Sequence, residues 1–253
     1  GSTPSSGKYS ENLKAALTYI LERRRVNGLI GFKDDYHYTY GHGFSMLFLS
    51  QVLGEEEDID RRKELVDALE RAVKFSVSAQ TKAGGWGYVS SKSSSFDEGS
   101  TTITQVQGLR GCRNAGIEVP KKAIDLAKKY IYDCQNDDGG ISYSSKSKGS
   151  SRPAITAAAV AVLYFAGRYD DPMADKAFAY ARRTLPIRRS GGHHYYAHLY
   201  LAQAAYQKGG KDWSSYFPEM ATWLGGQQRK DGSWVGDSVG STYGTAIALT
   251  ILQ

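Results

Sequence analysis

Cysteine and long apolar runs are scarce in this sequence. Two of its 253 residues are cysteines, Cys112 and Cys134, which are too few for a disulfide framework. Both fall in helical patterns, where we expect buried structural thiols. No spacing of cysteine and histidine resembles a zinc site, so we predict no metal and no cofactor. No apolar run approaches the ~20 residues that span a bilayer, so we predict no transmembrane segment.

The net charge of +6 comes from basic residues that are spread in small groups along the chain. These groups fall in helical patterns without interleaved aromatic residues, which favours a solvated outer face over a nucleic-acid-binding module. We therefore expect a small molecule or a protein as partner, and no nucleic acid. Periplasmic, secreted and cytoplasmic locations all fit the sequence.

The composition, 41% hydrophobic and 23% charged, is typical of a globular protein. Residues 1–8 begin Gly1-Ser2-Thr3-Pro4, which we interpret as a cloning remnant and a flexible lead and leave out of the fold. We expect residues 9–253 to form one domain.

A glycine-containing turn recurs along the chain and divides it into repeats. The spacing is roughly 40 to 55 residues, a range typical of helical arrays. The turns are Gly28-Leu29-Ile30-Gly31-Phe32, Gly84-Gly85-Trp86-Gly87-Tyr88, Asp138-Gly139-Gly140-Ile141, Gly191-Gly192-His193 and Asp231-Gly232-Ser233-Trp234.

Two kinds of helix alternate around these turns. The segments before the turns, such as Leu65–Ala79 and Ala123–Cys134, have an apolar stripe and a charged face, which predicts outer helices. The segments after the turns carry no charge, which predicts buried inner helices at Ala154–Ala166, Tyr195–Tyr206 and Thr245–Leu252. We expect the inner helices to end at left-handed glycines, namely Gly54, Gly116, Gly167 and Gly209.

One pair of outer and inner helices cannot bury its own inner helix, which explains why the pair repeats. Pairs laid side by side bury the inner set by curving into a ring. The sequence therefore predicts an all-α fold, an α/α toroid of about five helix-pair repeats with amphipathic outer helices and buried inner helices.

The turns resemble the Gln…Gly…Trp repeat of the squalene–hopene cyclases, whose superfamily of α/α toroids includes the protein prenyltransferases. The resemblance rests on Gln80-Thr81-Lys82-Ala83-Gly84-Gly85-Trp86 and Gln228-Arg229-Lys230-Asp231-Gly232-Ser233-Trp234, and Gln135-Asn136-Asp137-Asp138-Gly139-Gly140 fits with Ile141 in place of tryptophan. It covers the chain from Tyr9 onward. In that family the glutamine and the tryptophan tie the turn to neighbouring helices, so the resemblance implies a structural role for the motif.

The catalytic signatures of that superfamily are missing. The chain lacks the Asp-x-Asp-Asp motif with which these cyclases protonate an alkene, the zinc-binding Asp-x-Cys pairing of the prenyltransferases, and the Asp-Asp-x-x-Asp motif of diphosphate-ionising enzymes. Asp137-Asp138 and Asp170-Asp171 fit a turn and the start of a helix. An alternative acid is Asp97 or Glu98, although the start of a helix also favours a carboxylate there for structural reasons.

Polar and aromatic residues collect at the expected N-termini of the inner helices, around the mouth of the ring. Counting back from the terminal glycines aligns Gly43, Gln105, Thr156, His198 and Thr245 in one layer. Such an opening suits a ligand whose polar groups lie near the mouth. We predict these cavity or ligand-binding residues: Tyr36, His37, Tyr40, His42, Thr102, Gln105, Arg152, Thr156, His193, His194, Tyr195, His198, Ser241 and Tyr243.

His194 and His198 lie one helical turn apart in the densest part of this set. Because histidine titrates near neutrality and tyrosine can relay protons, one interpretation is a site that transfers protons or grips a ligand. The other is that these rings pack at the rim of a helical barrel. The sequence places no carboxylate as a third metal ligand.

Three functions stay open. The missing signatures favour a non-catalytic module that binds a ligand or a protein over an enzyme. The alternatives are an isoprenoid cyclase or transferase with a non-standard acid, and a polysaccharide-lyase-like enzyme that uses Tyr, His and Arg. A cyclase needs a deep dry pocket with one isolated acid, a lyase needs Tyr195 or Tyr40 beside a histidine and an arginine, and a scaffold needs its largest apolar patch on the outside.

Overall fold

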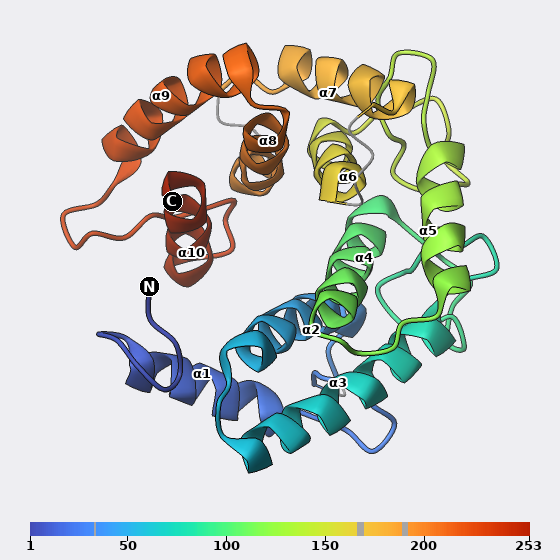
Figure 1. Ribbon diagram of the computed structural model, residues 1–253. Coiled ribbons are helices and arrows are strands. Elements are labelled where there is room, and N and C mark those ends of the chain that lie inside the picture. Colours follow the sequence, from blue (N-terminus) through green and yellow to red (C-terminus); the bar gives the residue numbers. More distant parts are fainter. Residues whose placement is uncertain (33, 166–169, 189–191) are drawn as a thin grey trace. The chain divides into compact units, whose positions relative to one another are not determined.

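The computed structural model describes residues 1–32, 34–165, 170–188 and 192–253. All regular structure in these residues is helical, apart from isolated antiparallel bridges, which confirms the all-α class. The helices, shown in Figure 1, are α1 (Ser10–Leu21), α2 (Tyr38–Glu55), α3 (Ile59–Ala79), α4 (Gly99–Asn114), α5 (Lys121–Asp133), α6 (Pro153–Phe165), α7 (Pro172–Thr184), α8 (His194–Lys208), α9 (Gly210–Gln227) and α10 (Ser241–Leu252).

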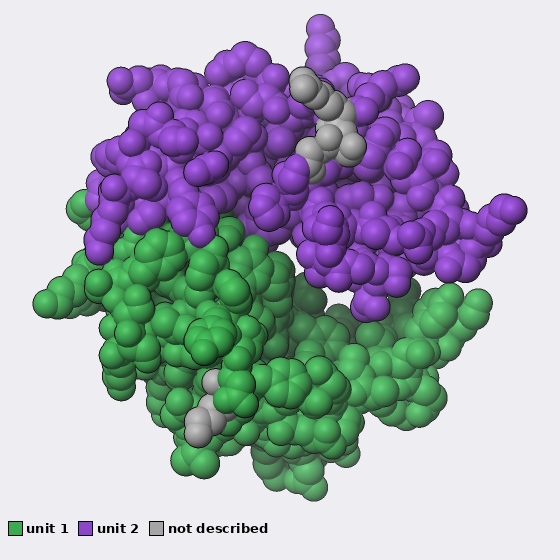
Figure 2. Space-filling model, turned by 180° about the vertical axis from the view of Figure 1, so that it is seen from behind, with its two compact units in different colours: residues 1–131 green, residues 132–253 purple. Residues whose placement is uncertain are grey.

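The chain divides into two compact units, residues 1–131 and residues 132–253, which Figure 2 colours green and purple. The division falls inside α5, within the range expected to form one domain. The single domain stays a prediction, and each unit is described by itself below.

Unit 1 is organised around the contact between α2 and α4, with α3 packed against both. Two glycines bring the inner helices close together. A Cβ on Gly43 would lie 2.7 Å from the backbone of Thr104, and a Cβ on Gly108 would lie 2.5 Å from the carbonyl oxygen of Gly43. Because no larger residue fits, α2 and α4 pack backbone to backbone.

Unit 2 alternates inner and outer helices as the repeat predicts. The inner helices α6 and α8 pack together, and α8 packs against α10. The outer helices lie outside them, with α7 packed on α6 and α8, and α9 on α8 and α10 (Figure 1). The inner helix α6 carries no charge, and its residues are buried from Ile155 to Tyr164.

The recurring glycine marks the place where each turn meets the next outer helix. Gly84 and Gly139 have φ values of 98° and 89°, which side chains rarely adopt. A Cβ on Gly84 would lie 2.3 Å from the carbonyl oxygen of Leu126, and a Cβ on Gly139 would lie 2.7 Å from that of Lys176. The motif therefore needs glycine for two reasons, the conformation of the turn and the closeness of the next helix.

In two turns, the glutamine of the motif ties the turn to that same outer helix. The Nε2 atom of Gln80 donates to the carbonyl oxygens of Gly84 at 2.8 Å and Ala123 at 2.9 Å. Gln135 donates in the same way to the carbonyl oxygens of Gly139 at 3.1 Å and Met173 at 3.0 Å.

The tryptophan of the motif ties the turn to the outer helix that precedes it. The indole N–H of Trp86 donates to the carbonyl oxygen of Ser76, and that of Trp234 to the carbonyl oxygen of Leu224, both at 2.8 Å. The two tryptophans are almost fully buried. These bonds give the motif a structural role in the described turns.

The predicted glycine caps follow two of the helices and fail at a third. Gly116 follows α4 with a φ of 87°, whereas Gly209 follows α8 with a φ of 69° and a ψ of −158°, which is positive in φ but outside the αL region. Gly54, in contrast, lies inside α2, so the prediction of a left-handed cap there is wrong. The Arg62 guanidinium donates to the carbonyl oxygens of Leu53 and Glu56. These carbonyls at the end of α2 therefore have hydrogen-bond donors without a glycine turn.

Gly167 and Gly191 lie outside the described residues. The acidic pairs are as predicted, because Asp138 accepts from the Gly140 N–H within its turn and Asp171 caps the N-terminus of α7.

Candidate functional site

Four of the inner helices hold a glycine turn through one side chain near their start. Thr102, Thr156 and Thr245 each accept a hydrogen bond at Oγ1 from the backbone N–H of the apolar turn residue, at 2.9, 2.8 and 3.0 Å respectively. His42 does the same through Nδ1, which accepts from the Ile30 N–H at 3.0 Å. The predicted site residues Thr102, Thr156 and His42, and Thr245 with them, therefore act as ties between turn and helix.

His42 uses both ring nitrogens in this role. Its Nε2 atom lies 3.1 Å from the carbonyl oxygen of Ala72, to which it donates because Nδ1 is the acceptor. The ring is fully buried, and burial lowers the pKa of His42 to about 4, although the bond to Ala72 opposes the shift. His42 is thus neutral and committed to the fold.

Gln105 lies one turn deeper in α4 and is also committed to the fold. Its Nε2 atom donates to the carbonyl oxygen of Thr39 at 2.5 Å, and its Oε1 atom accepts from the Ser76 hydroxyl at 2.5 Å. The turn bonds align Thr102, and not Gln105, with Thr156. Counting back from terminal glycines gave the wrong register because Thr102 lies 14 residues before Gly116, whereas Thr156 lies 11 residues before Gly167.

An aromatic cluster lies at the surface of unit 1, where α2 begins. We use the name aromatic cluster for six side chains at or beside the start of α2, which include two sets of ring contacts: Tyr36, His37, Tyr40, Phe44, Tyr88 and Phe96. The His37 and Tyr88 rings meet edge to face with centroids 4.4 Å apart, and Tyr88 and Phe96 follow at 5.9 Å. Tyr40 and Phe44 lie 5.7 Å apart on α2. Tyr36 is 83% exposed and Phe44 and Phe96 are each 37% exposed, so these three rings face solvent in part.

Three hydrogen bonds hold the start of α2 against the loop that carries Tyr88. The Thr39 N–H donates to the carbonyl oxygen of Tyr88 at 3.2 Å, and the Thr39 hydroxyl donates to that of Gly87 at 2.5 Å. The Ser90 N–H donates to the hydroxyl of Tyr38 at 2.7 Å. The loop that carries Tyr88 and Phe96 is therefore fixed against the start of α2.

The candidate acids Asp97 and Glu98 are both buried and both accept hydrogen bonds. Asp97 accepts from the Tyr130 hydroxyl at 2.9 Å and from the Thr81 hydroxyl at 3.2 Å. Glu98 caps α4 by accepting from the Ser100 N–H at 2.8 Å and from the Thr101 N–H. Both carboxylates thus hold local structure, and neither is an isolated acid.

The predicted residues of α8 point toward the outer helix α9. His194 and His198 are buried with ring centroids 4.3 Å apart, and the ring of Trp223 lies 4.6 Å from that of His194. The Tyr216 ring stacks beside His198 at 6.0 Å, and its hydroxyl lies 3.0 Å from Nδ1 of His198. These side chains form a compact aromatic layer between α8 and α9.

Burial disfavours the charged form of both of these histidines. It lowers the pKa of His194, against the attraction of the Asp237 carboxylate. It lowers the pKa of His198 to about 3, with His194 and Arg182 acting in the same direction and the carbonyl of Pro186 in the opposite one. Tyr195 is also buried, and burial together with Asp237 raises its pKa.

Asp237 is a residue that the sequence analysis missed, and it anchors the start of α8. Its carboxylate accepts from the backbone N–H groups of Tyr195 at 2.9 Å and Tyr196 at 2.8 Å, and the Tyr243 hydroxyl donates to it at 3.3 Å. Asp237 and Ser238 both have positive φ, 50° and 61°. Two successive left-handed residues turn the carboxylate toward the helix, where it meets the positive end of the dipole.

The remaining predicted residues lie apart from this layer or on its surface. His193 is exposed with a φ of 65°, and Ser241 is exposed at the start of α10. Arg152 is exposed at the start of α6, with its guanidinium 5.9 Å from the ring centroid of Tyr143. The structure thus places Tyr36, His37 and Tyr40 in the aromatic cluster of unit 1 and His194, Tyr195 and His198 on α8 in unit 2. Arg152 and Ser241 lie outside both groups.

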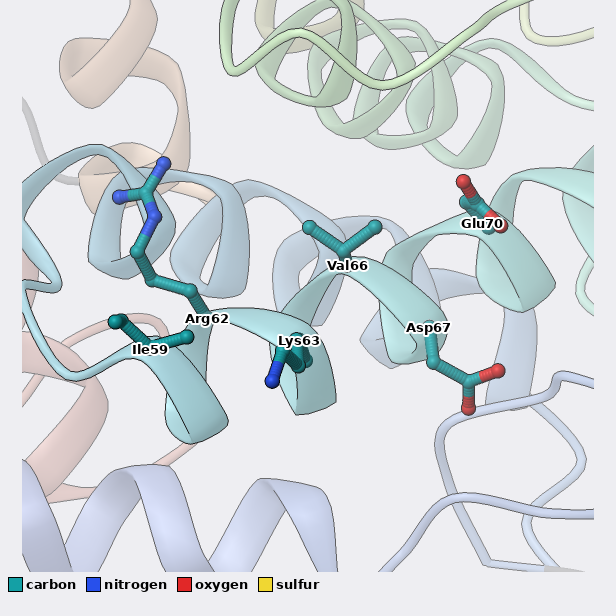
Figure 3. A pocket seen from close by; sticks show the side chains of 6 residues that line it. All are labelled: Ile59, Arg62, Lys63, Val66, Asp67 and Glu70. Atoms are coloured by element: carbon teal, nitrogen blue, oxygen red, sulfur yellow. The ribbon is translucent and has the colours of Figure 1, made fainter.

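A shallow groove of about 430 Å³ runs along the outer face of α3 and contains none of the predicted residues. Figure 3 shows Ile59 and Val66 in it, flanked by charged side chains. Lys63 is paired with Asp60 at 3.2 Å, and Asp67 with Arg71 at 2.9 Å. This is the solvated face of an outer helix, and it differs from the deep dry pocket that a cyclase needs.

Among the described residues, no three histidine, cysteine or acidic side chains lie close enough to hold a metal together. Cys112 and Cys134 are buried, as expected, and burial raises the pKa of Cys112 to about 12. In the part of the chain that the structure describes, no helix is long and apolar enough to cross a bilayer.

No protein-family model matches this chain, and no curated protein matches it in sequence. Solved structures do match. A protein from Actinoplanes is similar with a TM-score of 0.70 and 16% identity, over 97% of this chain and 74% of its own. The type II terpene cyclase MstE from Scytonema is similar with a TM-score of 0.68 and 17% identity, over 96% of this chain and 72% of its own.

A variant of that cyclase in complex with its substrate, geranylgeranyl dihydroxybenzoate, is similar with a TM-score of 0.69 and 17% identity, over 96% of this chain and 71% of its own. At this identity the similarity shows the fold alone. It confirms the predicted class, an α/α toroid fold of the terpene-cyclase type. The narrower resemblance to squalene–hopene cyclases stays a prediction.

Proposed function

We propose that this domain binds a prenylated small molecule at the aromatic cluster of unit 1 and holds it without starting its cyclisation. The observation that carries the proposal is the exposed aromatic cluster itself, fixed by backbone bonds at the start of an inner helix. Aromatic side chains offer large apolar contact areas at little cost in conformational entropy. An isoprenoid chain is a partner of matching character.

The fold supports this class of ligand. The similar cyclase from Scytonema was solved with geranylgeranyl dihydroxybenzoate, which joins an isoprenoid chain to a polar aromatic acid. The aromatic cluster has a corresponding mixture of properties, because His37 and Tyr40 carry polar edges whereas Phe44 and Phe96 do not. We assign the isoprenoid chain to the apolar rings and the polar head to the polar ones.

The carboxylates of unit 1 support binding over cyclisation. Cyclisation that begins with protonation of an alkene needs an acid that presents its proton to the ligand. Asp97 instead receives hydroxyl hydrogen bonds on both oxygens, and Glu98 receives backbone hydrogen bonds at the start of α4. A buried polar network of this kind serves the fold.

The lyase alternative receives less support from the geometry. That chemistry needs an accessible tyrosine beside a histidine and an arginine. Tyr195 is only 6% exposed, so it is poorly placed to reach a polysaccharide. Tyr40 packs on Phe44.

Isothermal titration with geranylgeranyl dihydroxybenzoate, below the concentration at which it aggregates, tests the proposal. Burial of one large aromatic contact contributes about 1.5–3 kcal/mol, so Tyr88→Ala and Phe96→Ala should each raise Kd at least about tenfold. Tyr206→Ala is the matched control, because Tyr206 is 67% exposed on α8 in unit 2. Equal affinities in all three variants and the parent protein would overturn the assignment to this cluster.

A further inference from the structure

The groove on the outer face of α3 carries its charges in a fixed order. Residues four apart on a helix lie in one row. One row of the groove holds Arg62, Val66 and Glu70, and Figure 3 shows these three side chains on one side of the α3 ribbon. The other row holds Ile59, Lys63 and Asp67. In both rows the basic residue comes first, so the groove has a basic half toward the N-terminus of α3 and an acidic half toward its C-terminus.

This order of charges does not serve the helix itself. The dipole of a helix favours acidic residues near the N-terminus, and an ion pair between residues i and i+4 is stronger when the acidic residue comes first. Lys63 precedes Asp67, which is the weaker order. The Glu70 side chain is exposed and forms no ion pair with another described residue. The charges of the groove are therefore available to a partner.

The groove also offers exposed apolar surface between fixed charges. Ile59 is 70% exposed, and Val66 lies in the middle of its row. Apolar side chains that are exposed and rimmed by polar ones mark interaction surfaces. The Arg62 guanidinium donates to the carbonyl oxygens of Leu53 at 2.9 Å and Glu56 at 2.8 Å, which holds this basic group in place before a partner arrives.

The outer helix α5 shows that this pattern is not general to outer helices. Its exposed charged residues are three lysines, Lys121, Lys122 and Lys129, and one acid, Asp125. A second copy of that face would meet it with lysine against lysine. The groove on α3 has two basic and two acidic side chains in separate halves, so an antiparallel copy of the groove complements it in charge.

We propose that the groove on α3 is the contact surface of a symmetric dimer, in which α3 packs antiparallel against α3 of a second copy of this chain. A two-fold axis at Val66 places Arg62 opposite Glu70 of the second copy, and the axis repeats that contact. Lys63 can leave its exposed pair with Asp60, 3.2 Å away, at little cost. The dimer does not use the aromatic cluster, so failure of one proposal leaves the other standing.

Sedimentation velocity over a range of protein concentrations tests the proposal. One helix face is a small interface, so we expect a reversible dimer with a Kd in the micromolar range that rises with salt. The double variant Asp67→Lys/Glu70→Lys makes the whole groove basic, and Lys63→Glu makes it mostly acidic. Each variant should raise Kd at least about tenfold, because like charges then replace opposite ones.

Mixing the two variants separates lost charge contacts from lost structure. In the mixture the intact acidic half of Lys63→Glu meets the intact basic half of the double variant, so mixed dimers should be at least about tenfold tighter than dimers of either variant alone. Lys121→Glu and Glu118→Lys/Asp125→Lys make the same changes of charge at exposed positions outside the groove and should leave Kd unchanged. A monomeric parent protein, an unchanged Kd in the groove variants, or a mixture without mixed dimers would overturn the proposal.

Discussion

The turns need glycine for two reasons, a positive φ and the closeness of the next outer helix. Replacing the turn glycines by alanine separates the two effects on stability. Gly84, Gly139 and Gly232 hold the same position in three turns, with φ values of 98°, 89° and 83°. An alanine in this conformation costs roughly 1–2 kcal/mol at each of them. The three positions differ in the space for the new methyl group.

That space sets the order of the losses. The added Cβ would meet the carbonyl oxygen of the next outer helix at 2.3 Å for Gly84 and 2.7 Å for Gly139, whereas at Gly232 the nearest atom is Nε2 of Gln228 at 3.9 Å. Overpacking of this kind costs about 1–3 kcal/mol. Gly232→Ala should therefore lose about 1–2 kcal/mol of the free energy of unfolding and Gly84→Ala about 2–5 kcal/mol, with Gly139→Ala between them.

Urea denaturation followed by circular dichroism measures these differences, and equal slopes of the transitions make the midpoints comparable. Gly232→Ala is the control for the conformational cost alone. Equal losses in Gly84→Ala and Gly232→Ala would refute the argument that the turn needs glycine because the next helix lies against it.

Three further predictions concern buried polar groups. Because the folded pKa of His42, about 4, lies below the ordinary value of 6.5, its contribution to stability is present above pH 6.5 and is lost as the pH falls toward 4. His42→Gln should remove about 3 kcal/mol of that pH dependence, measured as the free energy of unfolding from pH 4 to pH 7. Trp86→Phe should lower the free energy of unfolding by at least about 1–3 kcal/mol, because it removes the indole N–H that pairs with the Ser76 carbonyl. If urea denaturation gives the same free energy of unfolding for Trp86→Phe and the parent protein, the proposed role of this hydrogen bond is wrong. Asp237→Ala should lower the free energy of unfolding by about 1–2 kcal/mol and speed hydrogen exchange at the Tyr195 amide. Asp237→Asn should lower it less, because asparagine keeps an acceptor and tolerates positive φ. Equal exchange rates in Asp237→Ala and the parent protein would count against the role of Asp237 at the start of α8.

The sequence predicts local features of the fold well because their causes are local. The spacing of Gly84 and Gly139 marks the turns, and the neighbouring glutamines mark their ties. The uncharged stretch in α6 predicts a buried helix, and Asp171 predicts the start of α7. Each of these depends on a few consecutive residues.

The register between repeats is not local, and there the sequence analysis failed. Gly54 lies within α2 because Arg62, from the next helix, satisfies the last carbonyls. Counting from such glycines aligned Gln105 with Thr156, whereas the hydrogen bonds to the turns align Thr102. Side chains supplied by a neighbouring helix do not show in the pattern of the helix that they cap.

The sequence analysis found only part of each candidate site, because some of the residues come together through contacts between distant segments. The tyrosines and histidines near the start of α2 were identified, but Phe96 and Tyr88 join them only through the bonds that fix their loop. Asp237 gave no signal beyond a loop with flanking glycines, since its role depends on two left-handed residues that aim it at α8.

The claim that the domain binds a prenylated molecule without cyclising it is tested most directly by product analysis. The purified protein is incubated with geranylgeranyl dihydroxybenzoate, and the extract is separated by chromatography with mass detection, because a cyclised product has the same mass and a different retention time. The account predicts that the compound is recovered unchanged by the protein that binds it in titration. A cyclised isomer that disappears in Asp97→Asn would contradict the account and identify Asp97 as the acid of a cyclase.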